Sequence, residues 1–276
     1  MIKKMYLKTT VAILIAVILL FPIYWMAVTS LKTDTEIYSK IPTFFPKVVT
    51  FEGYIDQFTQ RAAAPMYITV LNSVTIAVLT MLISTALAVC TAYGLARFQL
   101  KVNKYIMLIF LVSQMMPVVL FLTPQFVIFK SMKLLDNLLA PVVSTCVHAV
   151  PFGVLTLRPY FFSIPLELED SALIDGCNMF TSFTRVMLPI AYPGVFVIAA
   201  FSFLWGWGNL MAPLTFIRSE NLLPLTINLY KAIGQYGIKW NGLMAYAVIM
   251  TAPVLLIFLI IQKHLVSGLT AGAVKG

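Results

Sequence analysis

The sequence predicts an all-α integral membrane protein with six spanning helices. Of its 276 residues, 61% are hydrophobic and 11% are charged, whereas an average soluble domain is about half apolar and about a quarter charged. Long charge-free runs follow one another along the chain, at 9–31, 62–96, 105–129, 137–157, 186–217 and 240–262. Each run reaches the ~20 residues that a helix needs to cross about 30 Å of hydrocarbon. Because open strands leave backbone groups unsatisfied in lipid, these runs are expected to be helices.

The expected helices belong to one domain covering residues 1–276, and they lie at about 10–30, 66–96, 105–129, 138–158, 191–217 and 241–262. The first run follows a lysine cluster at residues 3–8 and has some features of a signal peptide. It stays bulky as far as Trp25, however, and has no clear small-residue cleavage site. We therefore interpret it as the first spanning helix.

Prolines are frequent in the later helices, where each removes a backbone donor and can kink the helix. Seven lie in or at the ends of the third to sixth helices: Pro117, Pro124, Pro141, Pro151, Pro193, Pro213 and Pro253. The alternative is that prolines are simply common in membrane helices. Kinked helices would leave cavities in the membrane domain.

The formal net charge of +9 does not indicate nucleic-acid binding, because the basic residues form no stripe with interleaved aromatics. The 19 lysine and arginine residues divide almost evenly between the two sides of the membrane. The basic cluster at 3–8 and the short loop Arg97–Lys104 favour the cytoplasmic side. Both termini are then cytoplasmic, and the loop Lys32–Arg61 is the largest outside segment, where an external partner is expected to bind.

One acidic, turn-marked segment, residues 160–189, lies between the fourth and fifth helices. Pro165 suits a first helical turn, and Gly176 suits the position just past a helix end. Glu167, Glu169 and Asp170 follow Pro165. Carboxylates at these positions are stabilised by the positive N-terminal end of a helix dipole. A short helix is therefore expected from Leu166 to Asp175.

Residues four apart share a face of this short helix, so Ser171 lies over Asp175 and Ala172 over Gly176. The result is a narrow stripe that fits a groove of another protein. Asn178 is expected to cap a second short helix that ends before Pro189.

This segment resembles the cytoplasmic coupling loop of the permease subunits of ATP-binding cassette (ABC) importers. That loop reads Glu-Ala-Ala, three residues, Gly, nine residues, Ile-x-Leu-Pro. The matching positions here are Asp170-Ser171-Ala172, Gly176 and Val186-Met187-Leu188-Pro189. Asp170, Ser171 and Val186 depart from the family residues, so the register, Gly176 and Leu188-Pro189 carry the resemblance. It implies a type I ABC importer permease fold, also called MetI-like.

Within these permeases, the chain is most similar to the smaller permease subunit of maltose-type systems, in the carbohydrate branch. The residues that are similar to this branch are Asn72-Ser73, Ala92–Arg97, Ile174–Gly176 and the tail Gly268–Gly276. Where family members often carry Trp-Asn-Glu-Phe before Pro-Leu, this chain has Trp207-Gly208-Asn209-Leu210 before Pro213-Leu214.

The resemblance implies a bacterial plasma-membrane importer in which this chain forms half of the pathway. The implied partners are a second permease in a heterodimer, two cytoplasmic ATPases that hold ATP and Mg, an extracytoplasmic binding protein and a carbohydrate. The expected contacts with the ATPases are made by the coupling loop, through Glu169, Asp170, Ser171, Ala172, Asp175, Gly176, Leu188 and Pro189. The cytoplasmic tail at 263–276 is expected to reach the ATPases as well, through Gly268, Gly272, Lys275 and Gly276, on an extended path that its glycines permit.

No set of residues in the sequence indicates catalysis, a metal site or ATP binding. There is no Ser, His and carboxylate set within a helix and no P-loop. Cys90, Cys146 and Cys177 have no metal-ligand or redox spacing and are expected to be unpaired. His148, alone in its helix, is more typical of a hydrogen-bonded packing residue than of a ligand. The chain is therefore expected to bind no cofactor and no nucleic acid, and to hydrolyse no ATP.

A neutral, hydroxyl-rich substrate needs aromatic faces and amide groups. The expected substrate-path residues are Gln114, Gln125, Trp205, Trp207 and Asn209. The tryptophans are equally suited to packing or to an interfacial anchor. Two alternatives stay open: a permease for another solute, such as a phosphosugar or peptide, and an integral membrane enzyme.

Overall fold

The computed structural model describes residues 2–59, 65–98, 101–231 and 239–273. Within these residues the chain is built from helices and their connections, with no β-strand. The chain divides into two compact units, one of Met1–Tyr67 with Asn228–Pro253 and the other of Ile68–Ile227 with Val254–Gly276. The described part contains five helices long and apolar enough to cross a membrane, or six if one sharply bent pair counts as a single span.

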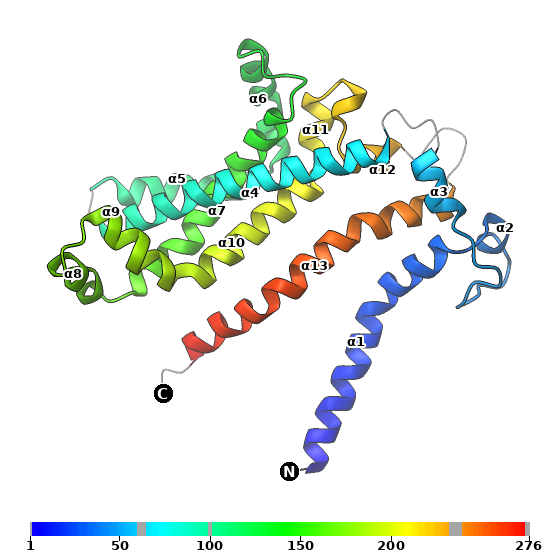
Figure 1. The fold of residues 1–276 in the computed structure, drawn as a ribbon, viewed down its shortest axis with the longest axis horizontal. Helices are drawn as coiled ribbons and strands as arrows, with labels where there is room; N and C mark the ends of the chain where they lie inside the picture. The colour runs from blue at the N-terminus through cyan, green and yellow to red at the C-terminus, as the bar shows by residue number, and fades with distance from the viewer. Residues whose placement is uncertain (1, 60–64, 99–100, 232–238, 274–276) are drawn as a thin grey trace. The chain divides into compact units, whose positions relative to one another are not determined.

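The first unit begins with α1 (Ile2–Ser30), which is followed by the short helices α2 (Asp34–Ile37) and α3 (Glu52–Thr59). It also contains most of α12 (Leu225–Lys231) and the first part of α13 (Trp240–Ala273). Inside this unit Gly53 on α3 lies so close to the backbone of Asn241 that a Cβ there would stand 2.8 Å from its carbonyl oxygen. The contact seats α3 on the start of α13 (Figure 1).

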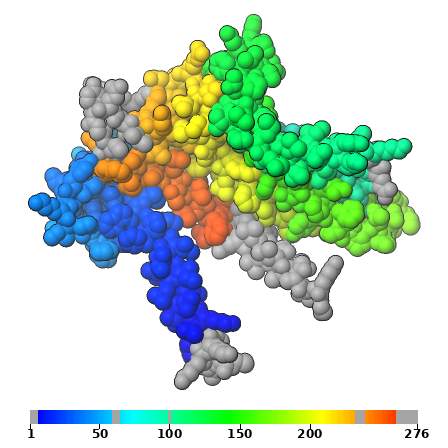
Figure 2. All heavy atoms as spheres, turned by 180° about the vertical axis from the view of Figure 1, so that it is seen from behind, coloured from blue at the N-terminus to red at the C-terminus, as the bar shows by residue number. Residues whose placement is uncertain are grey.

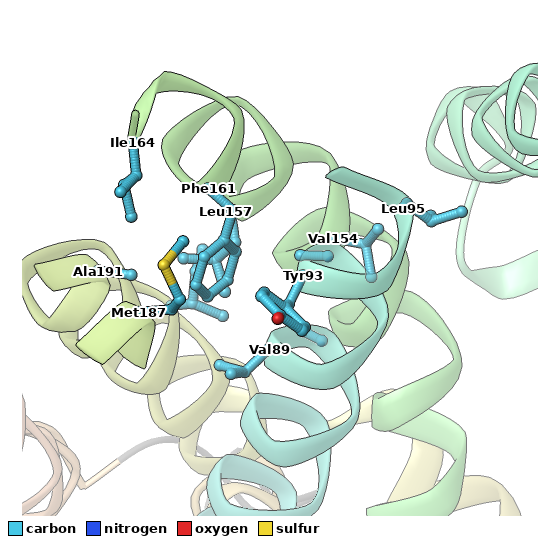
Figure 3. Close-up of a cluster of buried hydrophobic side chains, with 12 residues drawn as sticks. Val89, Tyr93, Leu95, Val154, Leu157, Phe161, Ile164, Met187 and Ala191 are labelled. Carbon is cyan, nitrogen blue, oxygen red and sulfur yellow. The ribbon is translucent and has the colours of Figure 1, made fainter. Parts of the chain in front are cut away.

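The second unit holds the remaining helices, whose bounds are α4 (Met66–Arg97), α5 (Asn103–Met115), α6 (Val119–Ser131), α7 (Leu139–Ser163), α8 (Leu166–Ile174), α9 (Met179–Ser182), the π-helix η1 (Phe183–Met187), α10 (Leu188–Gly208), α11 (Met211–Phe216) and the 3-10 helix η2 (Glu220–Leu222). Its main buried cluster lies where the end of α4 meets α7, η1 and the start of α10. Figure 3 shows Tyr93, Phe161 and Met187 meeting there. The Tyr93 ring lies 4.6 Å from Phe183 and 5.7 Å from Phe161 between ring centroids.

The prediction of a single helix at 105–129 is wrong, because the chain bends by 107° between α5 and α6. Met116, which precedes Pro117, takes an extended conformation with ψ 134°. A proline disfavours the helical region for the residue before it, so α5 ends here. In Figure 2 the green α6 stands up from the teal α5. Other prolines leave their helices continuous, for example Pro151 and Pro159 in α7.

The expected helix at 191–217 also differs, because α10 ends at Gly208 and Asn209 is extended, with ψ 117°. The Asn209 Oδ1 accepts a hydrogen bond of 3.0 Å from the Ala212 N–H in the first turn of α11. Two glycines near the end of α10 weaken helix propensity, and the asparagine side chain favours a new helix start.

The sequence predicted that the short helix after Asn178 ends before Pro189. The structure instead continues helically through this position. Asn178 caps α9 through a capping box with Thr181, but the chain then passes through η1 directly into α10. Pro189 falls in the first turn of α10, where its missing N–H is tolerated. The wider π-helical turn before it lets the backbone pass the proline ring.

Candidate functional site

The acidic segment forms α8, which is terminated at Gly176. Gly176 has φ +89°, a left-handed conformation that glycine adopts without a Cβ clash. The Cys177 N–H donates to the Ala172 carbonyl at 3.0 Å and the Gly176 N–H to the Leu173 carbonyl at 3.1 Å. These two bonds are the Schellman pair that ends a helix cleanly. The predicted role of Gly176 as helix stop is confirmed.

The two faces of α8 differ sharply in exposure. Glu169 and Ala172 are buried, so they hold the helix to its own chain and do not face a partner. The other predicted contact residues of the loop are exposed: Asp170, Ser171, Asp175, Gly176 and Pro189. Leu188 is half-buried against the main cluster. The predicted stripe of Ala172 and Gly176 is therefore not one outward face, because Ala172 turns inward.

Exposed apolar side chains lie along α8 and at the start of α9. Ile174 is 86% exposed and Phe180 is 72% exposed. Leu166, Leu168, Leu173 and Met179 are exposed as well. We call these six residues the α8–α9 apolar surface. None of the six was among the predicted contact residues, although bulky apolar residues inside an acidic, turn-marked segment are a usable signal of a contact surface.

Glu169 joins α8 to the end of α4. Its carboxylate lies 2.9 Å from the Arg97 Nε, and the two side chains are only 6% and 5% exposed. The Tyr93 hydroxyl donates to the same carboxylate, and the Arg97 Nη2 donates to the Ile164 carbonyl at 2.9 Å. We call Tyr93, Arg97 and Glu169 the α8 anchor. Glu169 thus makes the internal ion pair, whereas the neighbouring Asp170 is exposed.

The predicted substrate-path residues fall into two groups in the second unit. In the first, the Gln114 Nε2 donates to the His148 carbonyl at 3.1 Å, and the His148 ring lies 5.3 Å from Trp205. Phe152 packs edge-on against Trp205 at 4.9 Å. Gln114, His148 and Trp205 are half-buried, so an amide, an imidazole and an indole share a partly open site between α5, α7 and α10.

The second group is committed to packing. The Ser144 hydroxyl donates to the Gln125 Oε1 at 2.5 Å, and the Asn209 Nδ2 donates to the Thr145 Oγ1 at 2.8 Å. Trp207 is buried and stacks on Phe203. These contacts tie α6, α10 and α11 to adjacent residues of α7. Gln125 and Asn209 thus join neighbouring elements to α7. Trp207 is a buried packing residue within α10, in line with the packing alternative for the tryptophans.

The tail differs from expectation, because α13 continues as a helix to Ala273 and does not extend from Gly268. Gly268 and Gly272 lie within this helix, whereas Lys275 and Gly276 lie outside the described residues. No group of three or more histidine, cysteine or acidic side chains suited to a metal occurs in the described part of the chain. The three cysteines are free, as predicted.

Comparisons with known proteins agree with this architecture. Residues 84–271 match the family described as binding-protein-dependent transport system inner membrane component. The sulfoquinovosyl glycerol transport system permease SmoH of Agrobacterium fabrum is 34% identical, over 93% of this chain and 89% of its own length. The diacetylchitobiose uptake system permease DasC of Streptomyces coelicolor is 32% identical, over 96% of this chain and 95% of its own.

A solved structure shares the fold. A chain of a bacterial ABC transporter involved in the import of the acidic polysaccharide alginate superposes with a TM-score of 0.77 at 20% identity, covering 94% of this chain and 95% of that one. The matched residues 84–271 contain α8 with its glycine stop, the α8 anchor and most of the membrane helices. This chain belongs to the binding-protein-dependent transport system inner membrane components, and it is a permease subunit of an ABC importer rather than an enzyme.

Proposed function

We propose that this chain forms half of the translocation pathway of a carbohydrate importer in a bacterial plasma membrane. It pairs with a second, different permease, and it works with an extracytoplasmic binding protein and two ATPases that hold ATP and Mg. Both termini and the segment 160–189 lie in the cytoplasm, where the ATPases are. The observation that carries the proposal is α8, a short, sharply stopped helix with exposed apolar side chains and a buried ionic attachment to α4.

In this proposal the α8–α9 apolar surface docks in a cleft of one ATPase. ATP has no site in the sequence of this chain, so its free energy must arrive through a mechanical contact. A contact that differs between the inward and outward states shifts the population between them. The α8 anchor passes the movement to α4, and the continuous helix from α9 through η1 passes it to α10.

Replacement of Gly176 by valine is expected to impair coupling more than replacement of Asp170 by alanine. A β-branched residue at φ +89° carries backbone strain of about 1–3 kcal/mol and loosens the helix stop. Asp170 is exposed and makes no ion pair in the described structure, so its loss is worth about 0–1 kcal/mol. The measurement is substrate-stimulated ATPase activity and uptake, with assembly checked by co-purification.

Apart from its two chain neighbours, no atom of the described residues lies within 4 Å of a Cβ built on Gly176. Gly176→Ala therefore adds the left-handed strain without a clash and is a milder control, expected between Gly176→Val and the parent. If Gly176→Val assembles and transports normally while Asp170→Ala does not, an ionic latch replaces this mechanism. Activity of the subunit purified without any ATPase would contradict the importer proposal itself.

For the substrate we propose an oligosaccharide or related polyol. SmoH and DasC are named for sulfoquinovosyl glycerol and diacetylchitobiose, and the alginate transporter for a polysaccharide. The site of Gln114, His148 and Trp205 fits this class, because an indole face stacks on a sugar ring and an amide bonds its hydroxyls. The second permease is expected to supply most of the sugar contacts.

Trp205→Ala is expected to lower the uptake rate about 2- to 10-fold, the range set by losing one aromatic contact. Tyr192→Ala is the matched control, because Tyr192 is an exposed aromatic residue on the same helix, away from this site. The cognate binding protein is first screened against sugars, phosphosugars and peptides to choose the transported solute. Exclusive peptide binding would overturn the substrate class, and equal uptake by the two variants would remove Trp205 from the pathway.

The tail is proposed to contact the ATPase pair as well. Its helical course to Ala273 supports a rigid extension of α13 and replaces the extended path expected from the glycines.

A further inference from the structure

The connection between α2 and α3 folds back along the end of α1 (Figure 1). The Tyr24 hydroxyl donates to the Phe44 carbonyl at 2.5 Å. The Phe44 ring lies edge-on to Trp25 at 5.9 Å, and Phe45 lies edge-on to Tyr24 at 6.2 Å. Because α1 ends at Ser30 and each helical residue rises 1.5 Å, Tyr24 lies about 9 Å before the helix end. Phe44 and Phe45 therefore lie beside the last two turns of α1, and not beyond its C-terminal end.

This connection is a built structure. Lys32 is buried, donates through Nζ to the Thr43 carbonyl and lies 4.7 Å over the Trp25 ring. The Thr43 hydroxyl donates to Glu36 at 2.5 Å, and the Lys47 N–H donates to both Glu36 carboxylate oxygens at 3.1 Å. The Thr50 N–H donates to the Leu31 carbonyl at 2.9 Å, which closes the loop at the end of α1. These hydrogen bonds hold the loop in a defined shape against the end of α1.

The side chains that this loop turns outward are apolar. Ile41 is 79% exposed and Phe45 is 73% exposed. Phe44, Val48 and Val49 are exposed as well. We call residues 41–49 the apolar loop tip. Two exposed lysines, Lys40 and Lys47, flank or lie within it.

The apolar loop tip continues the exposed apolar surface of α1. The membrane part of α1 is exposed along its length, from Val11 to Phe21. The Phe21 ring lies 5.8 Å from Trp25, and Trp25 in turn contacts Phe44. An unbroken row of aromatic rings therefore leads from the spanning helix to the loop. Aromatic residues of this kind collect at the membrane interface, where one end is apolar and the other is wet.

We propose that the apolar loop tip is inserted in the lipid interface beside α1, with membrane lipid as its partner. Phe45 and Ile41 enter the acyl boundary, and Lys40 and Lys47 reach the lipid phosphates. The insertion clamps the connection between α1 and α3 to the bilayer surface. The loop Lys32–Arg61 was expected to bind an external partner, whereas its tip contacts lipid here. It depends on α1 spanning the membrane, and it does not depend on the substrate or on the coupling mechanism.

The test places the photoreactive residue p-benzoylphenylalanine at Phe45 or, as the matched control, at Phe51. Both are exposed phenylalanines, but Phe51 follows Thr50, which is bonded to Leu31 at the very end of α1. The complete transporter is reconstituted in nanodiscs of phosphatidylethanolamine and phosphatidylglycerol, with and without its binding protein. Adducts formed on irradiation are identified by mass spectrometry.

Lipid adducts are expected to be several-fold more abundant at position 45 than at position 51, and unchanged when the binding protein is added. Equal lipid labelling at the two positions would overturn the proposal. So would crosslinking of position 45 to the binding protein at the expense of lipid, which would make the tip a protein-docking surface. Since Phe45 is exposed and its replacement keeps an aromatic ring, the variants are expected to fold, and ATP-driven uptake confirms this.

Discussion

Glu169→Ala is expected to destabilise the permease by about 3–5 kcal/mol, because it leaves the buried Arg97 guanidinium without its counter-charge. Arg97 and Glu169 are both almost completely buried at a separation of 2.9 Å, so solvent screens their interaction little. The Tyr93 hydroxyl loses its acceptor in the same variant. The α8 helix then loses its attachment to α4, so uptake and substrate-stimulated ATPase activity are expected to fall together.

Two other carboxylates on the same helix serve as controls. Glu167 and Asp170 are exposed, so alanine at either position is expected to change stability by no more than about 1 kcal/mol. The measurement is the midpoint of thermal unfolding of the purified transporter, together with ATP-driven uptake. A variant in which leucine replaces both Arg97 and Glu169 removes the two buried charges at once, so it is expected to recover part of the lost stability.

The double variant also separates anchoring from folding. If it regains stability but not coupling, the polar anchor transmits movement to α4. If Glu169→Ala is no more harmful than Asp170→Ala, the ion pair is not the attachment of α8.

Gly206→Val is expected to prevent normal assembly, because α10 crosses α4 closely at this glycine. A Cβ at Gly206 would lie 2.7 Å from the Ala77 Cα and 3.2 Å from the Ile76 carbonyl oxygen. These are backbone atoms, which cannot rotate away, so the helices must separate. Overpacking of this kind costs about 1–3 kcal/mol and sometimes more. Small residues allow such approaches between membrane helices.

Gly208→Val is the matched control, since Gly208 lies two residues away on the same helix. Outside its own helical turn, no atom of the described residues lies within 4 Å of a Cβ built there. Yield and monodispersity of the purified complex, followed by thermal unfolding, compare the two variants. Gly206→Val is expected to lose most of the assembled complex, whereas Gly208→Val stays close to the parent. Similar yields and unfolding midpoints for both variants would show that α4 and α10 are free to separate.

The sequence by itself determined the features that depend on local chemistry. Membrane character follows from the apolar runs, because a charge-free stretch of this length has no other stable placement. The bounds of α8 follow from the Pro165 and Gly176 signals, since a helix end is decided within one turn of backbone. The family followed from the register between Asp170 and Pro189, which survives changes in the individual residues.

Only the tertiary structure decided which side chains these elements turn inward. Adjacent Glu169 and Asp170 are equally suited to an ion pair by sequence, but the packing of α8 against α4 buries the first and exposes the second. Likewise Pro117 breaks a helix while Pro151 does not. The difference lies in long-range contacts: a proline or a carboxylate offers several local outcomes of similar energy, and neighbours far away in the chain select one of them.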